Sequence, residues 1–93
     1  MPTTKKQWTY LSNHAHLLVT LARNPSARVR DMAAVVGITE RAVQRILLEL
    51  QEAKVIAVTK VGRRNEYTIN MDSPLRHSLE GHRTIGDLIN SLE

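Results

Sequence analysis

A single glycine, Gly37, lies between two stretches of helical pattern and decides how the chain turns from one to the other. Before it, apolar side chains recur every three or four residues over 29–36, which predicts a helix with one inward face. After it, Thr39 is a good N-cap for a longer helix over 40–53, whose apolar residues form one stripe. Because glycine tolerates the left-handed backbone that ends many helices, residues 37–39 predict a tight turn between two helices.

Further elements are predicted on the two sides of this helix pair. Ser12 can cap a helix over 13–23, because a hydroxyl oxygen accepts a hydrogen bond from a free N–H group at a helix start. Two stretches, 55–59 and 66–70, carry β-branched or alternating apolar residues and predict strands joined by a basic turn at 61–65. The expected fold is therefore mainly α with a small β-hairpin, the wing: a three-helix core, the wing and a C-terminal helix.

The C-terminal segment contains two helix-start signals. Ser73-Pro74 pairs an N-cap residue with proline at the first helical position, and Thr84 with Asp87 has the spacing of a capping box. We therefore expect two short helices, or one helix broken at Gly81.

Composition limits the classes of function. At 93 residues the chain has the size of one domain, 1–93. It has no cysteine, and the spacing of its histidines suits no metal site, so we expect neither metal nor cofactor. It has no glycine-rich phosphate loop and no nucleophile–base pair, so we expect no enzyme. It also has no apolar stretch of the length that a signal peptide or a membrane span needs, which predicts a cytoplasmic protein without a membrane partner.

The charge distribution favours a duplex nucleic acid as the partner. The net charge is +4, and residues 28–70 hold eight basic and five acidic side chains. Residues 71–93 hold two basic and four acidic side chains, so the tail is not the nucleic-acid surface. Aromatic residues form only 3% of the chain, which argues against stacking on single-stranded bases.

Four positions have the spacing of a helix-turn-helix. Ala33 is small where two helices cross, Gly37 lies in the turn, and Val43 and Ile46 are branched residues on the inner face. Through the segment Val29–Ile46, the chain resembles the winged helix-turn-helix regulators, in particular the MarR-like and ArsR-like repressors of bacteria. The resemblance covers residues 12–70 and implies that they form a DNA-binding core.

The resemblance also implies which side chains contact DNA. The start of the third helix would enter the major groove, where arginine can pair with guanine and glutamine with adenine. The residues implied there are Thr39, Glu40, Arg41, Gln44 and Arg45; those implied at the wing are Arg63 and Arg64, and further phosphate contacts are Arg28 and Arg30. A charged helix face can also be merely solvated, and Arg28 stands where these families usually place a capping serine or threonine.

Residues 74–92 form an acidic, amphipathic tail, which the resemblance makes a dimerisation segment. The residues expected at the dimer interface are Trp8, Tyr10, Leu79, Ile85, Leu88, Ile89 and Leu92. A homodimer would place two recognition helices on successive major grooves and predicts an inverted-repeat site. Two alternatives remain open: the tail covers the domain's own core, or the protein is a winged-helix module that binds other proteins and no DNA.

Overall fold

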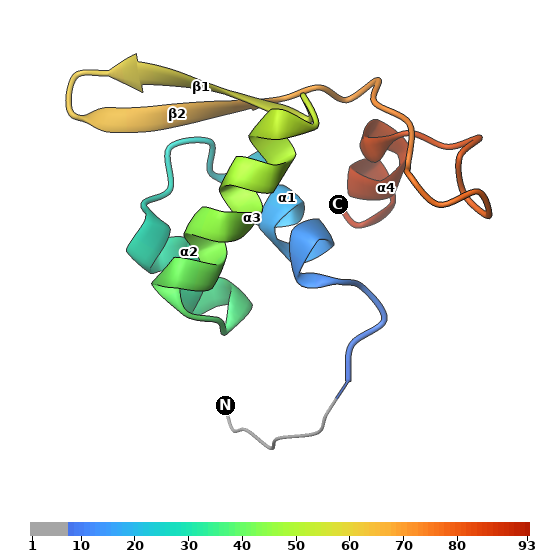
Figure 1. The fold of residues 1–93 in the computed structure, drawn as a ribbon, viewed down its shortest axis with the longest axis horizontal. Helices are drawn as coiled ribbons and strands as arrows, with labels where there is room; N and C mark the ends of the chain where they lie inside the picture. Colours follow the sequence, from blue (N-terminus) through green and yellow to red (C-terminus); the bar gives the residue numbers. More distant parts are fainter. Residues whose placement is uncertain (1–7) are drawn as a thin grey trace.

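The computed structural model describes residues 8–93. The order of elements is three helices, a hairpin and a fourth helix (Figure 1). Their bounds are α1 Asn13–Arg23, α2 Val29–Val36, α3 Glu40–Glu52, β1 Ile56–Val61, β2 Arg64–Ile69 and α4 Ile85–Ser91. The expected three-helix core, wing and C-terminal helix are confirmed. Among residues 8–93, no helix is both long enough and apolar enough to cross a membrane.

The helix starts follow the predicted caps. The Ser12 hydroxyl accepts a hydrogen bond from the Ala15 N–H at 3.3 Å, and the Thr39 hydroxyl accepts one from the Ala42 N–H at 3.0 Å. Gly37 ends α2 with φ 86°, a left-handed conformation that side chains other than glycine rarely adopt. Gly37 and Thr39 together fix the turn between α2 and α3, as the sequence predicts.

The wing is an antiparallel hairpin with a two-residue turn. Ile56 pairs with Ile69 at its base and Val61 with Arg64 at its tip, leaving Gly62 and Arg63 in the turn. Gly62 has φ 62°, the positive angle that tight hairpin turns need at their first central position. The hairpin is also tied to the helices, because the Tyr67 N–H donates to the Pro25 carbonyl at 2.8 Å.

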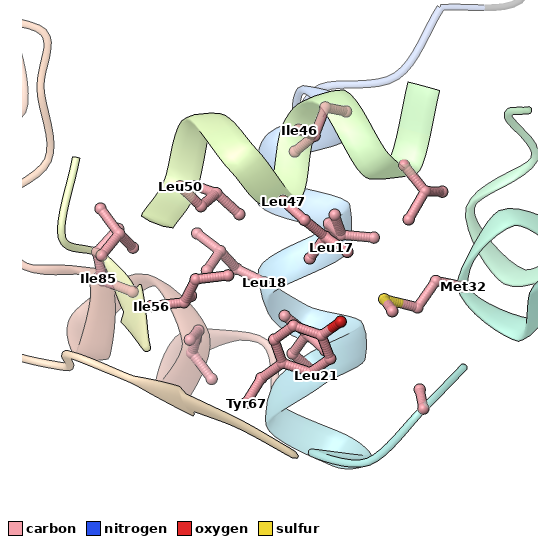
Figure 2. Close-up of a cluster of buried hydrophobic side chains, with 14 of the residues drawn as sticks. Leu17, Leu18, Leu21, Met32, Ile46, Leu47, Leu50, Ile56, Tyr67 and Ile85 are labelled. Atoms are coloured by element: carbon pink, nitrogen blue, oxygen red, sulfur yellow. The ribbon is translucent and has the colours of Figure 1, made fainter. Parts of the chain in front are cut away.

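One hydrophobic core joins all the elements. Leu17, Leu18 and Leu21 of α1 lie at its centre, between the inner face of α3 and the hairpin (Figure 2). The largest side chains with almost no exposed surface are Leu17, Leu21, Met32, Val43 and Ile46. Val43 and Ile46 are thus buried, so the opposite face of α3 is turned outward.

The C-terminal segment differs from the expectation. Residues 73–80 form no helix; Pro74 instead pairs with Thr84 in an isolated antiparallel bridge that closes a loop. A proline preceded by serine suits an extended segment as well as a helix start, since its fixed φ is compatible with both. The capping box at Thr84 and Asp87 is confirmed, with each residue's side chain accepting from the other's backbone N–H.

Helix α4 packs against α1 and covers the core of its own chain. Ile85 and Ile89 are only 6% and 2% exposed, so their place at a dimer interface is corrected to the monomer's core. Close backbone packing holds the start of this helix: the Gly86 N–H donates to the Met71 carbonyl at 2.9 Å. A Cβ on Gly86 would lie 2.9 Å from that same oxygen, which explains why a glycine stands there.

Candidate nucleic-acid interface

The outward face of α3 presents all five residues expected in the major groove. Thr39, Glu40, Arg41, Gln44 and Arg45 are exposed, because the buried stripe of the same helix faces the core. A shallow groove on this face is lined by Thr39, Arg41, Ala42 and Arg45. Two arginines one turn apart, with a glutamine between them, form a surface with strong hydrogen-bond donors for base edges.

Arg45 is not isolated on this face. Its guanidinium lies 3.5 Å from Oε2 of Glu49, one turn further along α3, and Oε1 of Glu49 lies 2.7 Å from Nε2 of His14 on α1. The hydrogen bond from His14, together with the positive charge of Arg45, lowers the pKa of the Glu49 carboxyl despite some desolvation. A carboxylate shared between two helices therefore lies beside the groove. The sequence analysis did not identify Glu49; its four-residue spacing from Arg45 was the available signal.

A second basic surface lies where the wing meets the start of α2. Its shallow pocket is lined by four cationic residues, no acidic residue, and parts of Ala27, Val29, Asn65 and Tyr67. The cationic residues are Arg28, Lys60, Arg63 and Arg64. Arg28 occupies the N-cap of α2, and its side chain accepts no hydrogen bond from the first N–H groups of the helix. These N–H groups are therefore not capped by Arg28. The positive end of the α2 dipole adds to this pocket's attraction for anions.

The expected wing residues have different environments. Arg63 lies in the turn, whereas the Arg64 guanidinium donates to the Ser26 carbonyl at 2.6 Å and ties the hairpin to the α1–α2 connection. Arg30 is exposed on α2 but does not line the basic pocket. Lys60 was not predicted as a site residue from the sequence. Its position opposite Asn65, one pair from the tip of the hairpin, is what places it in the basic pocket.

Several of the expected interface residues are exposed in the described chain. Trp8 and Tyr10 are 74% and 90% exposed, and their rings meet edge to face with centroids 4.8 Å apart. Leu79 is 81% exposed on the loop closed by the Pro74–Thr84 bridge, and Leu92 is 39% exposed at the end of α4.

A larger cavity, of about 600 Å³, opens between the start of α1, the end of α3, the 71–84 loop and α4. Its apolar wall includes Leu18, Leu50 and Ile85, and its polar wall includes His14, Glu49, Arg76 and Glu80. The His14–Glu49 pair therefore borders this cavity as well as the α3 face. Within residues 8–93, no cluster of three or more potential metal ligands occurs.

No family model matches the chain, and no curated protein matches it. Among solved structures, it is similar to MepR, described as a transcription regulator of the Staphylococcus aureus multidrug efflux pump MepA. The two share 17% sequence identity and superpose with a TM-score of 0.58 over 85% of this chain. The fold is a winged helix. The chain spans about half the length of MepR, 52%, so the likeness concerns the fold of that part.

Proposed function

We propose that this winged-helix chain is a sequence-specific regulator of transcription that binds duplex DNA, of the MarR-like or ArsR-like type. The observation that carries the proposal is the outward face of α3, where Arg41, Gln44 and Arg45 are exposed while the opposite stripe is buried. The likeness to MepR, a transcription regulator, supports it. The absence of cysteine and the excess of basic side chains over residues 28–70 fit a cytoplasmic protein that acts on DNA.

In this proposal the two basic surfaces have different tasks. Arg41 and Gln44 contact base edges in the major groove and discriminate between sequences. Arg28, Lys60 and Arg63 neutralise phosphates, which adds affinity and salt dependence but little sequence preference. Arg30 adds a peripheral phosphate contact. Arg64 orients the wing through Ser26, and its own phosphate contact is secondary.

Binding to a pool of random duplexes, followed by anisotropy on the selected sequence, tests the proposal. Arg41→Ala is expected to lose about 1–3 kcal/mol of preference for the selected sequence. Lys60→Ala is expected to weaken binding to all duplexes by the same factor. It should also reduce the slope of log affinity against log salt concentration by about 1. Arg76→Ala, next to the large cavity, is the matched control for the loss of one positive charge. Absence of duplex binding would refute DNA binding and favour a winged-helix module that binds proteins, and salt-independent binding would contradict the proposed phosphate contacts.

We further propose that two copies bind an inverted repeat, with residues 12–70 of each on the DNA. The interface would use the apolar residues that the core leaves over: the exposed Trp8, Tyr10, Leu79 and Leu92, together with the half-buried Leu88. Residues 74–92 then serve both the monomer's core and the contact between copies. Leu79→Asp is expected to give monomers by light scattering without loss of folding, since Leu79 is 81% exposed. A wild-type monomer at micromolar concentration would contradict this part.

A further inference from the structure

The carboxylate of Glu49 contacts both His14 and Arg45, and the proposed role of the outward face of α3 does not account for this double contact. We propose that Glu49 is a positioning residue that holds Arg45 back along α3, and that protonation of His14 loosens this hold and strengthens duplex binding. The inference rests on the proposed function, because it concerns the regulation of the same α3 face.

The geometry gives Glu49 two partners on two elements. Oε1 is 2.7 Å from Nε2 of His14, and Oε2 is 3.5 Å from the Arg45 guanidinium. The contact to α1 is the shorter, so Arg45 is the more weakly held partner. Because Glu49 lies four residues after Arg45, the ion pair draws the guanidinium toward the C-terminal end of α3. The reading end, with Thr39 and Arg41, is at the other end of the helix.

Arg45 therefore has two competing positions. Its side chain already lines the groove with Arg41 while it is paired with Glu49, and its guanidinium can either stay on that carboxylate or turn to a base or phosphate. A base contact requires the loss of the ion pair, whose contribution at this exposure changes an equilibrium constant by up to about fivefold. The hold is thus weak enough for DNA to break and strong enough to measure.

The charge of His14 sets the strength of this hold. Neutral His14 can only donate a hydrogen bond to the ionised carboxylate, so the negative charge of Glu49 stays available to Arg45. Protonated His14 places a full positive charge 2.7 Å from Oε1 and neutralises much of that charge. Lower pH therefore frees Arg45, and by linkage the capture of Arg45 by DNA favours proton uptake at His14.

The other groups around His14 come from known elements. The 71–84 loop places Arg76 and Glu80 at the same cavity, and the segment before α1 adds Tyr10. Helix α4 lines the cavity with Ile85 and Leu88 and with no charged residue, and Val55, just before β1, adds a further apolar side chain. Arg76 and Glu80 carry opposite charges, and Glu49 is the charged group in direct contact with His14 in the described chain. With His14 and Glu49 each 46% exposed in their side chains, protons reach the pair freely.

The first experiment measures duplex affinity between pH 7.5 and pH 5.5. As the pH falls over this range, the affinity of the wild type is expected to rise by a factor about three- to fivefold greater than the factor for His14→Gln. This variant keeps an N–H donor but cannot become charged. His16→Gln, on the same helix, is the control for the loss of a histidine and should retain the wild-type profile. Equal pH profiles for the wild type and His14→Gln would overturn the inference while leaving DNA binding intact.

The second experiment removes the charge of the positioning residue. Glu49→Gln is expected to bind duplex up to about fivefold more tightly than the wild type at pH 7.5, with a pH profile like that of His14→Gln. Glu52→Gln makes the same change in net charge on the same helix and should show a smaller gain and an unchanged profile. Equal gains in the two variants would show that only net charge matters, and would refute the positioning role.

The third experiment needs no DNA. The Glu49 carboxyl is followed by NMR during a pH titration of the free protein. Arg45→Ala and His14→Gln should each move the midpoint of this titration upward, because each removes a positive charge that lowers the pKa of the carboxyl. Unchanged midpoints would overturn the shared carboxylate. If the midpoints move as expected but no duplex binds at any pH, the proposed function fails and so does the role of Glu49 in duplex binding.

Discussion

Truncation of Ile89 decides whether α4 belongs to the core of its own chain. Ile89 is 2% exposed and packs in the same cluster as Leu17 and Leu21 of α1. Ile89→Ala removes three carbon atoms, each contributing about 0.8 kcal/mol through burial, and leaves a cavity whose cost adds to this. We expect a loss of about 3 kcal/mol in the free energy of unfolding, within the 2–5 kcal/mol range of such truncations.

Urea and thermal unfolding measure this loss. For a domain of this size, about 3 kcal/mol lowers the melting temperature by about 12–24 °C. Leu92→Ala, at the end of the same helix, is the matched control and should cost less than about 1 kcal/mol, because Leu92 is 39% exposed. Equal small losses for both variants would refute the docking of α4 on α1. A loss that depends on protein concentration would instead return Ile89 to an interface between copies.

Three further predictions concern turns and caps. Gly86→Ala should destabilise the protein far more than Gly81→Ala in urea unfolding, because the new Cβ would lie 2.9 Å from a backbone oxygen at Gly86 but no closer than 3.6 Å at Gly81. Gly37→Ala should cost about 1–2 kcal/mol through its positive φ alone, since no atom lies within 4 Å of the added Cβ; Gly37→Asn, which tolerates this φ, should cost less. The backbone hydrogen bond from Thr84 lowers the pKa of Asp87 below 3.8, so its contribution to stability is present above that pH and is lost as pH falls through the lowered pKa. Asp87→Asn should therefore reduce the acid dependence of unfolding below pH 4, and an unchanged profile would contradict the capping box.

The helices and the turn between them could be predicted from sequence because their determinants are local. The caps at Ser12 and Thr39 and the positive φ of Gly37 each act within a few residues. The 73–80 segment could not be predicted in this way, since its conformation depends on pairing between Pro74 and Thr84 across a loop.

The site was predictable to the extent that periodicity shows which helix face points outward. That pattern identifies the exposed face of α3, but it does not show what covers an apolar face. The apolar residues of α4 were therefore consistent with a partner chain or with the domain's own core, and burial assigns Ile85 and Ile89 to the core. Contacts between residues distant in the sequence, such as His14 with Glu49 and Arg64 with Ser26, cannot be predicted from the spacing of neighbouring residues.

The two hydrogen bonds that fasten the hairpin to the α1–α2 connection set the distance between the protein's two basic surfaces. Arg64 binds the Ser26 carbonyl and Tyr67 binds that of Pro25, so the wing cannot swing independently of the helices. Any duplex that engages α3 and the wing together must bring its groove and its flanking phosphates to that fixed separation. If the proposed function holds, sequences that bend or narrow easily to meet it would be favoured even at base pairs that no side chain reaches.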